Sequence, residues 1–449
     1  MPGTSGSRRS VSTKLQRIAE LAREMPGVPL TTLSHHIDIE FLEEAFRRTN
    51  KRGAPGVDGQ TAQEYGMNLD YYLPRLLERA KSGTYRAPAV RRTNIPKGKG
   101  KETRPLGIPT TEDKVLQRAV TMILDAVYEQ EFLDGSYGFR PGRSAHKALE
   151  ALWKGLMDMG GGWVLEIDIR KFFDTLDKRI LMDTLRQRVR DGVILRLVAK
   201  WLNAGVMEEG NLFFPEEGTP QGGVISPILA NVYLHEVLDA WFESEVKPTL
   251  KGKAFLVRFA DDATLVFSRK ADAQMVLDLL PERFGKYNLA LHPVKTRLVD
   301  FRRPSKRGSN PPKGPEKPAS FDLLGFTHHW ARSRKGRWVI KRRTAKDRFT
   351  RGLWKIKEWC RIHRHDWVSQ QHKALTAKLR GHFAYYGITG NSKALSRFRN
   401  EVIKIWRKWL GRRSQRARIT WEKFNKLLAQ FPLPPPIAIH SIYRRAANP

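Results

Sequence analysis

The chain has 449 residues, 40% of them hydrophobic, which is long and apolar enough for two or more folded domains. Its 81 lysine and arginine residues outnumber 46 aspartate and glutamate residues, and the formal charge of +35 predicts a polyanionic partner. No apolar run approaches the roughly 18 residues of a membrane span, and the single cysteine, Cys360, excludes an intrachain disulfide and a multi-cysteine zinc site.

The positive charge is concentrated in the last third of the chain. From Arg302 to the end there are 37 basic and 7 acidic residues, together with eight of the twelve tryptophans. Basic residues interleaved with aromatic ones are typical of surfaces that bind single-stranded or structured nucleic acid. Because the N-terminus lacks the apolar core of a signal peptide, we expect the protein in the bacterial cytoplasm or nucleoid.

A basic hairpin is predicted for residues 92–110, RTNIPKGKGKETRPLGIPT. Lys97 and Arg104 would lie on its two arms, where an ammonium and a guanidinium can converge on a triphosphate. A basic hairpin without a ligand is the alternative. The apolar pattern of residues 113–129 then predicts a core helix.

A second basic loop, SYGFRPGRS at residues 136–144, carries Arg140 and Arg143 and leads into an amphipathic helix capped by Ser144. Arginines beside a helix start can hold phosphates, and they can equally be solvated loop charges.

Residues 163–177, WVLEIDIRKFFDTLD, begin as a strand whose alternation puts Glu166 and Asp168 on the face opposite the apolar side chains. An acid near the end of an apolar strand is costly unless it is paired, solvated or bound to a metal. Asp168 is therefore a candidate metal ligand, whereas Asp174 and Asp177 are interpreted as a turn residue and a helix cap.

A glycine-bearing turn at residues 219–223 precedes a buried helix that starts near Ser226. Gln221 in this turn could donate to a nucleotide, or it could be structural.

Residues 255–268, FLVRFADDATLVFS, are predicted to form a hairpin with Asp261 and Asp262 at its tip. Paired carboxylates are common in exposed turns, which is the simpler interpretation. They are also tolerated where divalent cations screen them, and paired metals can carry out phosphoryl transfer. Asp168 would then supply the third carboxylate.

The last third begins with a proline-rich linker at residues 302–320 and a basic hairpin at 330–349, and helices follow. Basic side chains on the polar faces can follow a phosphate backbone, or they can be solvated surface charges. The candidates include Arg342, Arg343, Lys355 and Lys357. His382 and Tyr385 either stack on RNA bases or fill the helical core.

Seven blocks, in order, resemble those of reverse transcriptases, specifically the kind encoded by group II introns. They are RPLGIPT, GFRPGRS, EIDIRKFFDTLD, GTPQGGVISPILANVYL, RFADDATLVF, LALHPVKT and FDLLGF, and GHFAYYG resembles the maturase block. The resemblance covers about residues 51–387, with Phe259 in place of the family's usual tyrosine. It implies an α+β fold, a right-hand polymerase with helical and β fingers, an antiparallel-sheet palm and a mainly helical thumb or maturase domain.

The domains that this resemblance implies follow one another along the chain. They are an N-terminal extension with the start of the fingers (1–85), fingers (86–165), palm with finger elements (166–301), a proline-rich linker (302–320), a thumb or maturase domain (321–410) and a short basic tail that binds DNA or RNA (411–449). Some relatives carry a nuclease after this tail, and we expect none here.

The resemblance also implies roles for single residues. Asp168 and Asp261 would be catalytic and hold two Mg²⁺ ions, with Asp262 in support. Nucleotide contacts would come from Lys97, Arg104, Phe173, Gln221 and Lys295, with Phe173 beneath the deoxyribose and its neighbour Phe172 as the alternative ring. Primer, template or RNA contacts would come from Arg140, Arg143, Leu324, Gly325, Phe326, Arg342, Arg343, Lys355, Lys357, His382 and Tyr385.

Together these features predict an RNA-directed DNA polymerase that copies RNA into cDNA and assists the splicing and retrohoming of its group II intron RNA. The expected partners are that RNA, an RNA template with a DNA or RNA primer, target DNA and dNTPs, with no membrane. The protein would be a monomer or homodimer. The alternatives are a domesticated or defence-associated reverse transcriptase that acts on a different RNA, and a non-catalytic RNA-binding splicing factor.

Overall fold

The computed structural model describes residues 4–96, 103–208, 211–213, 222–304, 319–333, 335–414 and 419–440. The chain divides into two compact units. The first comprises Met1–Leu152 and Trp163–Leu298, and the second comprises Trp153–Gly162 and Val299–Pro449. The finer division into six segments stays a prediction.

The first unit begins with helices that pack around α5 (Thr111–Tyr128), which occupies almost the range predicted for a core helix. The helices before it are α1 (Thr4–Glu24), η1 (Ser34–His36), α2 (Ile39–Arg48), α3 (Ala62–Gly66) and α4 (Leu69–Ser82). Local capping sets the starts of two of them: Asp38 accepts from the Phe41 amide, and Thr61 and Glu64 form a capping box.

A four-stranded sheet, ordered β2-β1-β4-β5, contains the predicted basic hairpin. Its strands are β1 (Val90–Pro96), β2 (Thr103–Ile108), β4 (Val206–Glu208) and β5 (Asn211–Phe213). Strands β1 and β2 are antiparallel, and Ile95 pairs with Arg104.

A second four-stranded sheet, ordered β6-β7-β3-β8, carries the predicted carboxylates. Its strands are β3 (Trp163–Ile167), β6 (Ala254–Phe259), β7 (Asp262–Phe267) and β8 (Arg297–Asp300). Helix α11 (Lys270–Gly285) packs against β3 and β7. Leu165 and Ile167 are buried while Glu166 is half-buried, as the alternation predicts. Trp163 and Val164 depart from it, because Trp163 is only half-buried and Val164, on the face of Glu166, is fully buried.

The remaining helical segments all lie between α5 and β6 in the chain. They are α6 (Ala145–Met159), α7 (Phe172–Thr175), α8 (Lys178–Arg186), α9 (Gly192–Leu202) and α10 (Ser226–Leu234), followed by η2 (His235–Ala240), η3 (Phe242–Val246) and η4 (Lys247–Thr249). Asp177 caps α8 by accepting from the amides of Arg179 and Ile180, which confirms the predicted helix cap. Segments η2 and η3 are π-helical.

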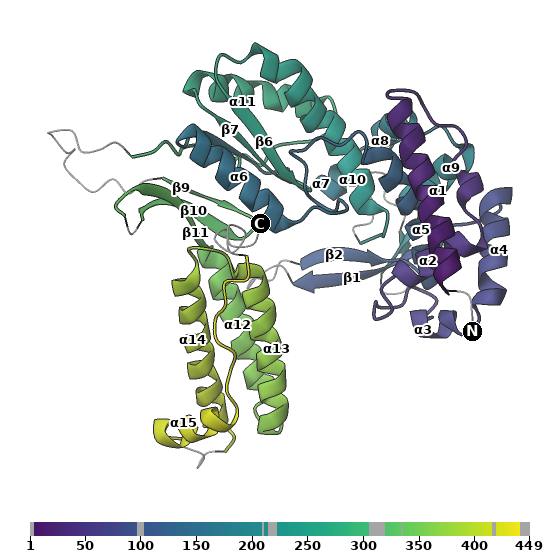
Figure 1. Cartoon of the computed structure of the whole chain (residues 1–449). Coiled ribbons are helices and arrows are strands. Elements are labelled where there is room, and N and C mark those ends of the chain that lie inside the picture. The colour runs from purple at the N-terminus through teal and green to yellow at the C-terminus, as the bar shows by residue number, and fades with distance from the viewer. Residues whose placement is uncertain are drawn as a thin grey trace. The chain divides into compact units, whose positions relative to one another are not determined.

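The second unit combines an antiparallel sheet with a helical bundle (Figure 1). The strands are β9 (Ser320–Leu323), β10 (Phe326–Arg332) and β11 (Trp338–Thr344), and the helices are α12 (Lys346–Ile362), α13 (Val368–Tyr386), α14 (Ser392–Leu410) and α15 (Trp421–Gln430). Strands β10 and β11 form the predicted basic hairpin. Leu375, Val402 and Trp406 lie in a separate hydrophobic core of this bundle.

The structure thus combines helices with mainly antiparallel sheets, which confirms the predicted α+β class. Within the described ranges, no helix has the length and hydropathy needed to cross a bilayer.

Candidate active site

The hairpin of β6 and β7 presents two carboxylates at its turn. Phe259 pairs with Asp262, so Ala260 and Asp261 form the connection between the strands. Ala260 has a φ of 56°, a left-handed conformation that is uncommon for a residue with a Cβ atom. Asp261 is half-buried and Asp262 is exposed. The turn therefore holds Asp261 at the edge of the sheet and in reach of solvent.

The third carboxylate lies at the same end of the sheet because of the register between β3 and β7. Ile167 pairs with Ala263, so continuing the register by one residue sets Asp168 opposite Asp262. Neighbouring strands of a sheet are about 4.8 Å apart. The backbone of Asp168 is held on its other side, since its carbonyl accepts from the His292 amide at 2.8 Å.

Lys295 supplies a positive charge to this end of the sheet. Its ammonium lies 3.2 and 3.3 Å from the two carboxylate oxygens of Asp168. Both side chains are partly exposed, at 56% for Lys295 and 33% for Asp168. An incoming cation or phosphate can therefore compete for either partner of this ion pair.

Carboxylate oxygens are the donors that Mg²⁺ prefers, and this ion is usually held by one or two carboxylates together with substrate phosphates. Asp168 and Asp261 fit that pattern as donors. Across the ranges that the structure describes, no three His, Cys, Asp or Glu side chains form a preformed metal cluster.

The two phenylalanines after β3 differ in accessibility. Phe172 is 3% exposed, and its ring lies 6.4 Å from that of Tyr233 in the core. Phe173 is half-buried. Of the two rings that the sequence left as alternatives, Phe173 is the accessible one.

The predicted nucleotide contacts are only partly described by the structure. Arg104 is exposed on β2. Lys97 and Gln221 lie outside the described residues. The turn after Gln221 is anchored, because the Gln117 side-chain oxygen accepts from the amides of Val224 and Ile225 at 2.8 and 3.3 Å.

Arg140 is buried and fully engaged within its own loop region. Its guanidinium pairs with both oxygens of Glu129 at 2.9 and 3.0 Å and donates to the carbonyls of Phe132, Leu133 and Ser136. All five of its N–H donors are therefore used. Arg140 is therefore structural and has no donor left for the RNA contact that the sequence predicted. Arg143 is half-buried and pairs with Asp134 at 2.6 Å.

In the second unit, Leu324 and Gly325 form the turn between β9 and β10, and both have a positive φ. A Cβ atom on Gly325 would lie 3.1 Å from the Tyr386 hydroxyl. Tyr385 donates to the Leu324 carbonyl at 2.9 Å. Phe326 is fully buried, so only the turn itself is accessible to a primer.

The basic candidates of the second unit separate into buried and exposed residues. Arg342 is 5% exposed and lies over the Trp153 ring, so the phosphate contact expected of it is withdrawn. Arg343, Lys355 and Lys357 are exposed.

His382 stacks on Phe398 with 3.7 Å between ring centroids, and burial lowers its pKa to about 4. It fills the helical core as an uncharged ring, which was the alternative to base stacking.

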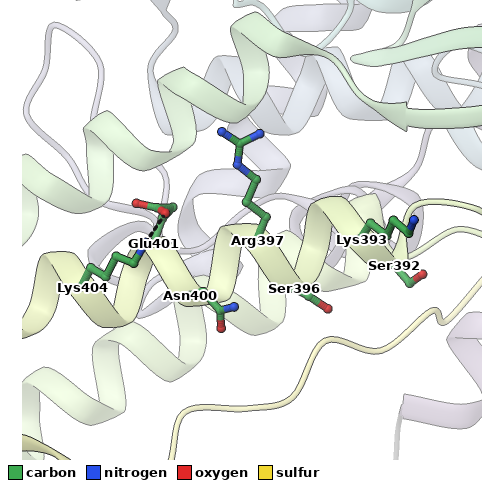
Figure 2. Close-up of a pocket in the computed structure, with 7 residues that line it drawn as sticks. All are labelled: Ser392, Lys393, Ser396, Arg397, Asn400, Glu401 and Lys404. Atoms are coloured by element: carbon green, nitrogen blue, oxygen red, sulfur yellow. Dashed lines mark hydrogen bonds and ion pairs between the residues drawn. The ribbon is translucent and has the colours of Figure 1, made fainter.

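A polar pocket along α14 was not predicted from the sequence. Figure 2 shows the residues that line it, which are Ser392, Lys393, Ser396, Arg397, Asn400, Glu401 and Lys404. Residues 392, 396, 400 and 404 recur every four positions, so they share one side of the helix. This four-residue spacing is visible in the sequence, but Ser392, Ser396 and Asn400 are uncharged and do not stand out among the basic residues.

Comparison with known proteins decides the family. Residues 95–328, just over half of the 449 residues, match the family described as reverse transcriptase (RNA-dependent DNA polymerase). The chain belongs to the reverse transcriptase family.

The relatives of this reverse transcriptase include proteins encoded by introns. It is 39% identical over 233 residues to the protein YkfC of Escherichia coli, covering 50% of this chain and 61% of that protein. It is 36% identical over 228 residues to the group II intron-encoded protein LtrA of Lactococcus lactis, covering 50% of this chain and 37% of LtrA. The chain therefore spans between about a third and two thirds of the length of these relatives.

Among solved structures, telomerase from Candida albicans in complex with a fragment of telomeric RNA aligns with 82% of this chain and 65% of its own length. The identity is 13% and the TM-score is 0.42. At that similarity the alignment adds nothing to the family assignment.

Proposed function

We propose that this reverse transcriptase is an RNA-directed DNA polymerase that copies RNA into cDNA by two-metal nucleotidyl transfer. The observation that carries the proposal is the register of β3 and β7, which sets Asp168 beside the hairpin that bears Asp261 and Asp262. Three carboxylates at one end of a sheet, with a lysine beside them, suit a reaction on a triphosphate.

In this proposal Asp168 and Asp261 hold the metal ions, and Asp262 supports them. Two bound Mg²⁺ ions would activate the primer 3′-hydroxyl and neutralise charge on the leaving pyrophosphate. The chain's own residues bind and orient the substrate. The triphosphate is held by Lys97, Arg104 and Lys295. Phe173 lies beneath the deoxyribose, where its ring would exclude a 2′-hydroxyl by size.

The test is an Asp261→Ala variant assayed for dNTP incorporation on a primed RNA template. We expect incorporation to be abolished while the affinity for the primed template stays within about twofold. Asp183→Ala is the matched control, because Asp183 is 71% exposed on α8, where it pairs with the neighbouring Arg186. Full-length cDNA from Asp261→Ala would overturn the assignment.

We also propose that the second unit binds group II intron RNA and assists its splicing and retrohoming. The support is the charge of this part of the chain, the exposed Arg343, Lys355 and Lys357, and the intron-encoded relatives. The test is the splicing rate, at limiting Mg²⁺, of a precursor RNA transcribed from the DNA that flanks the coding region. Acceleration by the wild type and by Asp261→Ala is expected, and no acceleration by either would reject this role.

A further inference from the structure

A single buried guanidinium ties the carboxylate-bearing turn to three other segments of the first unit. Arg258, in β6, is fully buried. It donates to both oxygens of Asp239 at 2.7 and 2.5 Å, to the Asn231 side-chain oxygen at 3.0 Å and to the Ser136 hydroxyl at 2.9 Å. Its fifth bond goes to the Ala260 carbonyl at 3.1 Å. Every N–H of the guanidinium is thus used.

The partner carboxylate is placed by an unusual helix. Asp239 is 1% exposed and lies in the π-helical segment η2. π-helical turns are rare and occur often at functional sites. Burial by itself would raise the pKa of Asp239, but the charge and hydrogen bonds of Arg258 outweigh it, so the pKa lies below its ordinary value. The pair is therefore ionised, which a fully buried pair requires if its bidentate geometry is to offset desolvation.

The same turn is held from its other side by backbone. A Cβ atom on Gly138 would lie 2.3 Å from the Ala260 nitrogen, so only glycine fits there. The Gly138 carbonyl accepts from the Asn231 side chain at 2.7 Å, and Asn231 also accepts from Arg258. Ala260 keeps its left-handed φ between these two supports. Strained backbone of this kind persists only where the surroundings over-determine it.

We infer that Arg258, paired with Asp239, is a positioning residue for Asp261, holding the Ala260–Asp261 turn in the conformation that metal binding requires. The inference rests on the proposed polymerase function. It adds a role that sequence patterns hide, since Arg258 lies on an ordinary alternating strand. The competing explanation is that the pair only stabilises the fold.

The test replaces the guanidinium of Arg258, which donates from three nitrogens, by an ammonium of the same charge. Arg258→Lys keeps a cation opposite Asp239 but has one nitrogen, which cannot reach Asp239, Asn231, Ser136 and the Ala260 carbonyl together. Arg188→Lys is the matched control: Arg188 is 4% exposed, pairs with Glu131 and donates to backbone carbonyls outside this network. Both variants should lower the melting temperature.

Only Arg258→Lys should change the reaction. At a temperature where all the proteins are folded, we expect its kcat to fall about 10- to 100-fold, with the KM for dNTP within about threefold of the wild type. The concentration of Mn²⁺ that half-saturates the protein should also rise. Electron paramagnetic resonance measures this concentration in a complex with an RNA template, a dNTP and a dideoxy-terminated primer, which cannot be extended. Arg188→Lys should keep the wild-type kcat and Mn²⁺ affinity.

A folded Arg258→Lys with wild-type kcat and Mn²⁺ affinity would overturn the inference. If Arg258→Lys does not fold, Asn231→Ala decides, because it removes the side chain that links Arg258 to the Gly138 carbonyl beside the same turn and leaves the Arg258 and Asp239 charges paired. Normal kcat and Mn²⁺ affinity in a folded Asn231→Ala would then reject the positioning role. An inactive wild type would instead reject the polymerase function, and the Mn²⁺ titration would still show whether Arg258 sets the metal affinity.

Discussion

The ammonium of Lys295 lies 3.2 Å from a carboxylate oxygen of Asp168, although 127 residues separate them in the chain. The ion pair joins a residue predicted to contact a triphosphate to one predicted to hold a metal. Without substrate, each neutralises the other at the end of the β6-β7-β3-β8 sheet that bears the carboxylates. Binding of a triphosphate with Mg²⁺ would give both a stronger partner.

Replacing Lys295 should therefore weaken nucleotide binding. We expect Lys295→Met to raise the KM for dNTP about tenfold, the loss of roughly one charge-assisted hydrogen bond, with a smaller effect on kcat. Steady-state incorporation on a primed RNA template measures both constants. Lys286→Met, at an exposed lysine paired with Glu282, is the control. An unchanged KM in Lys295→Met would show that Lys295 serves Asp168 alone.

The two phenylalanines after β3 should respond differently to truncation. Phe172 is buried in the core, so Phe172→Ala should lower the free energy of unfolding by about 3–5 kcal/mol. Phe173 is half-buried, and Phe173→Ala should lower stability less but allow ribonucleotides to be incorporated. Denaturant unfolding and the ratio of kcat/KM for dNTP and rNTP measure the two effects. Ribonucleotide incorporation by Phe172→Ala instead would reverse the assignment.

The stability of the first unit should carry a pH signature from Asp113. This carboxyl is 1% exposed, and burial raises its pKa to about 6 despite hydrogen bonds from Tyr85, Trp201 and Gln117. A raised pKa means that the folded state binds the proton more tightly. Asp113 therefore contributes about 3 kcal/mol to the free energy of unfolding below pH about 4, and this contribution is lost as the pH rises through about 6.

The comparison of wild type with Asp113→Asn isolates that contribution. The variant should gain stability relative to the wild type as the pH rises from about 4 to about 7, as measured by denaturant unfolding at several pH values. Carboxyls whose pKa is lowered, such as Asp191 and Asp239, affect both proteins equally. A stability difference that does not vary with pH would contradict the prediction.

Exposed basic residues of the second unit should set the salt dependence of RNA binding. Replacing Arg343, Lys355 and Lys357 together by glutamine should reduce the slope of log affinity against log salt by about 2 to 3, because each cation removed from the RNA backbone leaves about one counterion bound there. Filter binding at several salt concentrations measures the slope. A triple control at Arg186, Lys247 and Lys286 in the first unit should leave it unchanged. Equal slopes in all three proteins would place the RNA elsewhere.

Local patterns in the sequence were enough to predict the hairpins, the core helix α5, the cap of α8 and the carboxylates at the end of β3 and in the turn before β7. These features depend on side-chain alternation, helical spacing and capping, which involve residues a few positions apart. The family resemblance then gave these carboxylates their expected roles.

The tertiary structure alone decided which charged residues face solvent. Arg140 and Arg342 look like RNA contacts in the sequence, yet both are buried against partners within their own units. Arg258 looks like an ordinary strand residue, yet it pairs with Asp239 on a π-helical turn. A sequence shows where charges lie along the chain, but the free energy of burying each charge depends on partners that folding brings from distant segments.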